Sequence, residues 1–295
     1  MSTTSETSTA GALRSVPAPS RVSLSPFVGR WLLNGFVALV LAFLLLPTLI
    51  VMPMSVGQAS YIQFPPKGLT LNWYQAYLSD PDWMGATLFS LKTAFATTVG
   101  ATVIGTLASF ALVRGNLPGA RALQALTLAP LIVPHIVLAV ALYLVFAPIG
   151  LTGNFVGFVI AHTMLSVPYV MLTVSAALHR FDPALELAAL NCGANRAQAF
   201  WHVVLPNIAP GVAAGAVFAF LASFDEATVS FFISGVEGKT ITRKLFEDID
   251  YNLTPIIAAA STVMVVVSLA LMGGVEWLRS RGTNRSVNLP KSVTL

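Results

Sequence analysis

Apolar residues are gathered into long runs along this chain, and polar residues collect between the runs. A helix that crosses a bilayer needs roughly 20 mostly apolar residues, and six of the runs are long enough. The predicted spans cover residues 31–56, 86–113, 123–149, 155–177, 212–234 and 256–277. The pattern therefore predicts an all-α, polytopic membrane protein with six transmembrane helices.

Composition agrees with a membrane protein. Of the 295 residues, 56% are hydrophobic and only 9% are charged. Soluble domains carry about 25% charged residues, so this composition excludes an ordinary soluble globule. The single cysteine, Cys192, excludes an intrachain disulfide framework and leaves too few thiolates for a zinc or iron–sulfur site. We interpret the net charge of +4 as a record of topology, and we predict no nucleic-acid partner.

The basic residues are distributed unevenly between the segments that join the spans. With the N-terminus inside, most of the 16 Lys and Arg residues fall in cytoplasmic segments, and Lys92 falls within the second span. The basic residues in the outer loops are Lys67, Lys239, Arg243 and Lys244. The positive-inside rule therefore predicts that both termini are cytoplasmic.

The segments outside the spans complete the predicted organisation. Residues 1–26 are rich in Ser, Thr, Ala and Pro, which predicts a disordered cytoplasmic tail. A membrane domain follows over residues 27–280, and residues 281–295 form a second cytoplasmic tail. We expect a short interfacial helix in each of the two longer outer loops, residues 57–85 and 235–255.

The chain contains no recognisable active site. The string GVEGKT, residues 235–240, lacks the four residues between glycines that a phosphate-binding loop requires, and it falls in an outer loop. The histidines have no metal-ligand spacing, which favours packing or hydrogen-bonding roles for His135, His162, His179 and His202. Nucleophile signatures such as GxSxG are absent. We therefore predict no catalytic residue, metal or cofactor.

Two adjacent acids, Asp225 and Glu226, fall within the fifth predicted span. Acids at this depth are costly, so they tend to face the bundle interior or an aqueous path. One reading is a lining that favours a cationic substrate. The alternative is a structural ion pair with Lys92, or acids in an outer vestibule that never contact substrate.

The loop between the fourth and fifth spans has a specific local pattern. Asp182-Pro183 is typical of a helix start, because Asp accepts from free backbone N–H groups and Pro lacks one. Gly193 predicts a break, and a second helix fits residues 195–204, with Pro206 closing it. The sequence thus predicts a compact helix–turn–helix on the cytoplasmic side. An amphipathic hairpin on the membrane surface is the alternative.

This loop, residues 178–210, resembles the EAA loop of ABC importer permeases. The family pattern is Glu-Ala-Ala, three residues, Gly, nine residues and then Ile-x-Leu-Pro. This chain has Leu187 where the pattern has glutamate, and an acid precedes it. The resemblance assigns ATPase docking to Glu186, Ala188, Ala189, Gly193, Leu205 and Pro206. The stretches LAPLIVPHIVLAVALY, IAHTMLSVPYV and SFDEATVSFFISG further resemble spermidine/putrescine-type permeases.

The resemblance implies a type I ABC importer permease fold with cytoplasmic coupling helices between the fourth and fifth transmembrane helices. It implies half of a channel in a bacterial inner membrane, in contact with lipid. The implied partners are a second permease subunit, favoured as a different chain, two cytoplasmic ATPase subunits and an external substrate-binding protein. The implied solute is a polyamine such as spermidine or putrescine. ATP would be hydrolysed by the partner subunits.

Two alternatives compete with this reading. An ion-gradient-driven secondary transporter would show inverted repeats and helices broken at mid-membrane. Pro134 and Pro168 interrupt the third and fourth spans, but no matching halves are seen. Within the ABC importers, the solute is alternatively an opine, a phosphonate or an iron complex. An intramembrane enzyme is disfavoured, because adjacent acids on a helix diverge by about 100°.

Overall fold

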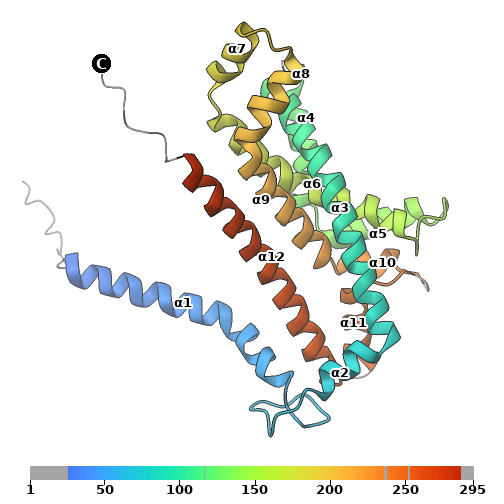
Figure 1. Cartoon of the computed structure of the whole chain (residues 1–295). Helices are drawn as coiled ribbons and strands as arrows, with labels where there is room; N and C mark the ends of the chain where they lie inside the picture. Colours follow the sequence, from blue (N-terminus) through green and yellow to red (C-terminus); the bar gives the residue numbers. More distant parts are fainter. Residues whose placement is uncertain (1–25, 116, 236–237, 252, 287–295) are drawn as a thin grey trace, which may run out of the picture. The chain divides into compact units, whose positions relative to one another are not determined.

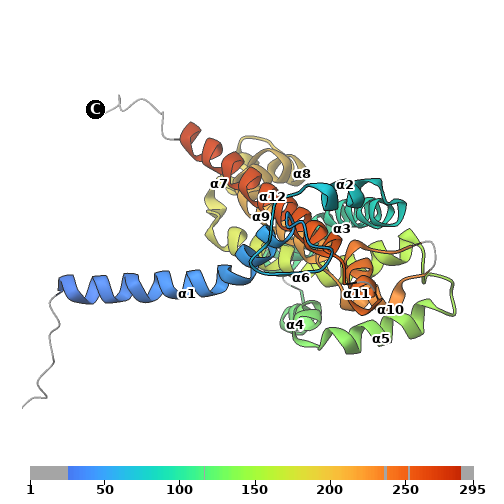
Figure 2. The same ribbon diagram turned by 90° about the horizontal axis from the view of Figure 1, so that it is seen from below.

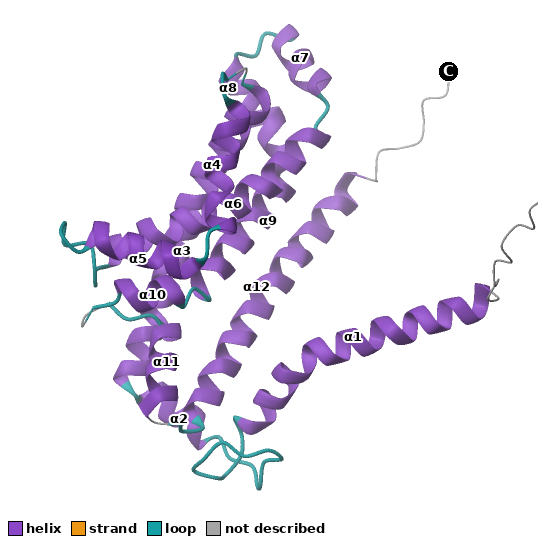
Figure 3. Cartoon of the chain, turned by 180° about the vertical axis from the view of Figure 1, so that it is seen from behind, coloured by secondary structure: helices purple, strands orange, loops and turns teal. Residues whose placement is uncertain are grey.

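The computed structural model describes residues 26–115, 117–235, 238–251 and 253–286. Every regular element within these ranges is a helix (Figures 1 and 3). The chain divides into two units, residues 1–49 and 50–295. The first predicted tail lies almost wholly outside the described residues.

The first unit contains most of α1, Pro26–Met54. Its apolar stretch Arg30–Met54 is long enough to cross a membrane. This helix accounts for the first predicted span.

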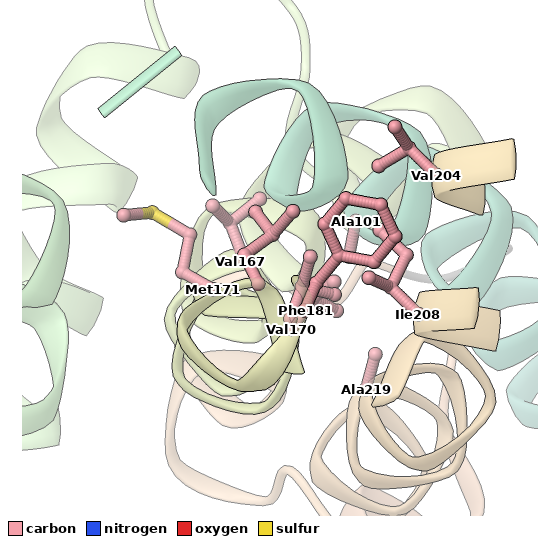
Figure 4. Packing of buried hydrophobic residues seen from close by; sticks show 10 residues of the cluster. Ala101, Val167, Val170, Met171, Phe181, Val204, Ile208 and Ala219 are labelled. Atoms are coloured by element: carbon pink, nitrogen blue, oxygen red, sulfur yellow. The ribbon is translucent and has the colours of Figure 1, made fainter. Parts of the chain in front are cut away.

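The core of the second unit is formed by three long helices. They are α3, Pro81–Arg114, α6, Phe155–Arg180, and α9, Leu205–Phe224. Each of them packs against the other two, and Figure 4 shows the buried side chains that meet between them. A long apolar helix, α12, Ile256–Ser286, follows and contacts α9.

Small residues let the core helices approach closely. A Cβ added to Gly215 of α9 would lie 2.6 Å from the Thr173 hydroxyl and 2.9 Å from the Val170 Cα of α6. Only glycine fits such a crossing without a shift of backbone. Close approach through small residues is a common way for membrane helices to associate. Lipid tails are as apolar as the helices, so van der Waals packing, and not the hydrophobic effect, drives the association.

A helix is present in each of the two loops for which one was predicted, residues 57–85 and 235–255. They are α2, Asn72–Ser79, and α11, Ile241–Tyr251. Both lie at the end of the second unit opposite α7 and α8 (Figure 1). The start of α3 follows α2 directly, where Asp80 accepts from the backbone N–H groups of Asp82 and Trp83.

The third predicted span is not one continuous helix. It consists of α4, Ala120–Ile132, and α5, His135–Phe146, which meet at an angle of 103°. Figure 2 shows α4 nearly end-on and α5 along its length. Pro134 explains the break, because it lacks an N–H and drives Val133 into an extended conformation with ψ of 133°. Among the described residues there are thus five helices that are long and apolar enough to span a membrane, or six if this bent pair is one span.

The fifth predicted span is also interrupted. Helix α9 ends at Phe224, and a short helix, α10, Thr228–Ile233, follows after three residues. The prediction of a continuous helix through Asp225 and Glu226 is therefore wrong. Helix α10 packs against α5, so the second halves of the two broken spans form a pair.

Pro206 does not close a helix as predicted. Helix α8, Arg196–Ala199, continues through a π-helical turn, η1, Phe200–Val204, directly into α9. In this wide turn the Leu205 N–H donates to the carbonyl of Phe200, five residues back. A wider turn relieves the clash between the proline ring and the preceding turn, so the helix passes Pro206 unbroken.

Candidate functional site

The loop between α6 and α9 forms a helix–turn–helix, here called the hairpin, residues 182–199. Its first helix is α7, Pro183–Asn191, which begins where Asp182 Oδ1 accepts the Ala184 N–H at 2.9 Å. Its second helix, α8, begins with a capping box in which Asn195 and Gln198 exchange hydrogen bonds of 2.8 and 2.9 Å. Both ends of the turn are therefore specified by local side chains.

Gly193 has the backbone geometry that the turn requires. Its φ is +92°, in the region that side chains other than glycine rarely adopt. Its N–H donates to the Leu190 carbonyl, and the Ala194 N–H donates to the Ala189 carbonyl. These two bonds form a Schellman motif, which satisfies carbonyl groups at the end of α7. The predicted break at Gly193 is confirmed.

The other motif residues are divided between the surface and the core. Ala188 is exposed on α7 and Ala189 is half-buried. Leu187, at the position where the motif has glutamate, is 60% exposed. Leu205 packs beside the core cluster of α3, α6 and α9, whereas Pro206 is exposed.

Glu186 makes an ion pair that the sequence did not predict. Its Oε2 lies 3.2 Å from Nη1 of Arg114, the last residue of α3, and both side chains are about four-fifths buried. The Arg114 guanidinium also lies over the ring of Phe181, 5.2 Å from its centroid. Phe181 follows the last residue of α6. The ends of α3, α6 and the start of α7 therefore meet at Arg114.

Asp225 and Glu226 border a cavity of about 710 Å³ between α6, α9 and α12. Asp225 is exposed and caps the end of α9, whereas Glu226 is 7% exposed. The Val229 N–H donates to Glu226 Oε1 at 2.8 Å, so this carboxylate caps α10. The cavity is further lined by Leu165, Tyr169, Phe218, Phe224, Met264 and Ser268.

The basic neighbour of Glu226 is a histidine, not the lysine considered from the sequence. Glu226 Oε2 lies 3.2 Å from Nδ1 of His135, the first residue of α5. Lys92 is exposed, and within the part of the chain that the structure describes it forms no ion pair. The proposed pairing with Lys92 is therefore wrong. The Pro134 break brings His135 to the acid, a turn that hydrophobic periodicity alone does not reveal.

A buried histidine links the two sides of the break in the fifth span. His162 of α6 is 1% exposed. Its Nδ1 lies 2.8 Å from the hydroxyl of Ser223 in α9, and its Nε2 lies 3.2 Å from that of Ser230 in α10. The predicted hydrogen-bonding role is confirmed for this histidine. The break itself is further fixed by Thr242, whose hydroxyl donates to the Glu226 carbonyl at 3.0 Å.

Several charged residues of the loop between α10 and α12 form ion pairs with one another. Glu247 accepts from Lys239 at 2.6 Å and from Arg243 at 2.9 Å. Partial burial opposes ionisation of the Glu247 carboxyl, but the two cations outweigh burial and lower its pKa. Lys239 of the GVEGKT string thus pairs with an acid on α11, while residues 236–237 of that string lie outside the described residues.

Comparison with known proteins decides the family. Residues 101–281 match the family model described as binding-protein-dependent transport system inner membrane component. The chain belongs to this family. The match runs from the middle of α3 into α12, so it includes both the hairpin and the cavity. The protein is thus a multi-pass inner-membrane permease of the ABC importer class.

Relatives of this permease have several named substrates. It is 31% identical to the spermidine/putrescine transport system permease protein PotC of Haemophilus influenzae, over 82% of this chain and 94% of that protein. It is 27% identical to the putrescine transport system permease protein PotI of Escherichia coli, over 71% of this chain and 77% of that protein. It is also 30% identical to the molybdenum transport system permease protein ModB of Mycobacterium bovis, over 69% of this chain and 83% of that protein.

The fold of the permease is that of solved ABC importers. A crystal structure of a bacterial ABC transporter involved in alginate import superposes with a TM-score of 0.69 at 14% identity, over 86% of this chain and 97% of that one. An amino acid ABC transporter crystallised with histidines superposes with a TM-score of 0.54 at 18% identity, over 73% of this chain and 100% of that one.

Proposed function

We propose that this permease forms half of the translocation path of an ABC importer for a polyamine such as spermidine or putrescine. The observation that carries the proposal is the 31% identity to a spermidine/putrescine permease across 94% of that protein. The acidic cavity agrees with it independently, because its chemistry suits an organic cation.

The cavity offers the groups that a polyamine requires. Ammonium groups need carboxylates or aromatic faces, and the methylene stems between them need apolar contacts. Asp225 and Glu226 supply the carboxylates, Tyr169 and Phe218 supply aromatic rings, and Leu165 supplies an aliphatic wall. The basic group on the lining is His135, which faces Glu226. We therefore assign the substrate path to Asp225 and Glu226.

We assign ATPase docking to the hairpin. The exposed residues Leu187, Ala188 and Gly193 form an uncharged edge at one end of the second unit, where α7 and α8 lie (Figure 1). The motif match supports this role for the exposed edge. The remaining motif residues, Leu205 and Pro206, begin α9, and Leu205 packs against the core cluster. This assignment places the hairpin and both termini in the cytoplasm.

The proposed assembly contains a second permease that is a different chain, two cytoplasmic ATPase subunits and an external binding protein. A solved relative of the fold was crystallised in complex with an alginate pentasaccharide-bound periplasmic protein, with a TM-score of 0.66. ATP hydrolysis in this scheme belongs to the partner subunits, and the permease needs no cofactor of its own.

A second candidate is an oxyanion importer, since one relative is a molybdenum permease at 30% identity. The two carboxylates in the cavity disfavour an anion, because like charges repel in a partly buried site. The test is ATPase activity of the assembled complex with its binding protein. Stimulation by spermidine or putrescine supports the proposal, and stimulation by molybdate alone rejects it. Uptake that continues without the ATPase subunits would identify an ion-driven transporter instead.

A further inference from the structure

The hairpin is joined to the membrane domain at two places by the chain itself. Helix α7 follows α6 through Phe181 and Asp182, and helix α8 runs through η1 into α9. A movement of the hairpin therefore reaches α6 and α9 directly. Helix α3, the third member of the core, has no such connection, because its last residue is followed by the segment that leads to α4.

Arg114 supplies a side-chain connection to α3. Its Nη1 lies 3.2 Å from Glu186 Oε2, and within the described residues no other ion pair joins α7 to a long helix. Phe181 lies beneath the guanidinium at 5.2 Å, which holds the charged group at the corner between α6 and α7. The aromatic pair Phe110–Phe200, with centroids 5.2 Å apart, adds an apolar contact between α3 and η1.

Glu186 is oriented differently from its neighbour on α7. Leu187, one residue later, is 60% exposed, whereas the Glu186 side chain is 23% exposed. Successive residues on a helix point about 100° apart, so an acid at position 187 would face outward and an acid at 186 faces the core. The shift of the acid by one residue, from position 187 to 186, thus places its carboxylate within reach of Arg114.

We propose that Arg114 and Glu186 are positioning residues that couple movement of the hairpin to α3, and that Glu186 does not contact the ATPase. This inference rests on the proposed docking of the ATPase at the hairpin. With the pair intact, ATPase movement reaches α3, α6 and α9 together. Without it, α3 follows through packing alone, and ATP hydrolysis yields less transport.

The test is a charge exchange in the complete transporter, reconstituted in proteoliposomes with its ATPase and its polyamine-loaded binding protein. Arg114→Glu and Glu186→Arg are each expected to keep the ATPase bound but to lower polyamine transported per ATP by about two- to fivefold, the range for a partly exposed ion pair. The double variant Arg114→Glu/Glu186→Arg is expected to restore the ratio. Arg121→Glu, at the exposed start of α4, is the matched control and should keep the wild-type ratio.

Several results would overturn the inference. Loss of the bound ATPase in Glu186→Arg, with no recovery in the double variant, would show that Glu186 faces the ATPase. Wild-type ratios in both single variants would show that the pair transmits nothing. If a charge-reversed variant does not fold, Glu186→Gln keeps the side-chain volume and should still lower the polyamine transported per ATP. An unchanged ratio in Glu186→Gln would reject the inference. Wild-type uptake without ATPase would instead reject the proposed function itself.

Discussion

The carboxylate of Glu226 lies between the first turns of two helices, with one oxygen 2.8 Å from the Val229 N–H and the other 3.2 Å from His135 Nδ1. His135 begins α5 and Val229 lies in the first turn of α10. Helix N-termini carry partial positive charge, which stabilises a carboxylate buried at this point. The breaks in the third and fifth spans are therefore held together by one acid.

The first prediction concerns that acid and its neighbour. Glu226→Gln keeps an oxygen that can accept from Val229, so we expect the protein to assemble normally. Loss of the charge-assisted contact to an ammonium group corresponds to about 1.5–3 kcal/mol, or roughly ten- to hundredfold slower uptake. Asp225→Asn should act in the same direction. Polyamine uptake at equal membrane protein level is the measurement.

Asp250→Asn is the matched control for these two variants. Asp250 is an exposed acid on α11 that lines no part of the cavity. It should transport at the wild-type rate. Normal polyamine uptake in the double variant Asp225→Asn/Glu226→Gln, at normal protein level, would show that neither acid contributes to the substrate path.

The second prediction concerns His162, which bridges α9 and α10. His162→Ala leaves the Ser223 and Ser230 hydroxyls without their ring partner in a buried site. Each stranded buried polar group costs about 1–3 kcal/mol, so we expect a lower melting temperature of the detergent-purified permease. His202→Ala, whose ring is exposed on η1, should leave the melting temperature unchanged. Equal melting of both variants would show that the bridge contributes little.

The third prediction concerns the turn of the hairpin. Gly193→Val forces a β-branched residue into a φ of +92°, where non-glycine residues lose roughly 1–2 kcal/mol. Open space surrounds the position, so the effect is conformational and not a clash. We expect less ATPase to co-purify. Gly193→Asn is the control, because asparagine tolerates this region, and equal loss in both variants would argue against a conformational cause.

Local signals predicted the helices and the hairpin well, because Asp182-Pro183 and Gly193 act on the backbone within a few residues of their own positions. They were less reliable at prolines inside apolar runs. The predicted interruption at Pro134 is confirmed, but Pro168, predicted to interrupt the fourth span, lies within continuous α6, and Pro206, predicted to close a helix, is passed by a π-helical turn. The same residue has three outcomes because the packing around each position decides whether the lost hydrogen bond is tolerated.

The acidic site was predicted only in part for the same reason. Asp225 and Glu226 were identified by their cost in an apolar run, which is a property of the sequence. Their partner depended on the 103° bend that brings α5 to α10. The depths of the residues, estimated along straight helices, favoured Lys92 as the partner. A bend of 103° makes that estimate of depth invalid. His135 could have been suspected only from its position directly after Pro134.

The last prediction uses the single native thiol as a probe of both orientation and docking. Cys192 is exposed at the end of α7, directly before Gly193. If the hairpin is cytoplasmic, a membrane-impermeant maleimide should label Cys192 in inside-out vesicles and leave it unlabelled in intact cells. A cysteine at the exposed Ser60, placed in a Cys192→Ser background, should show the reverse pattern.

Bound ATPase should slow labelling of Cys192 in inside-out vesicles, because the proposed docking edge includes the adjoining turn. Labelling of Cys192 from outside would reverse the proposed topology. Labelling from inside at the same rate with and without ATPase would keep the topology and move the docking edge away from Gly193.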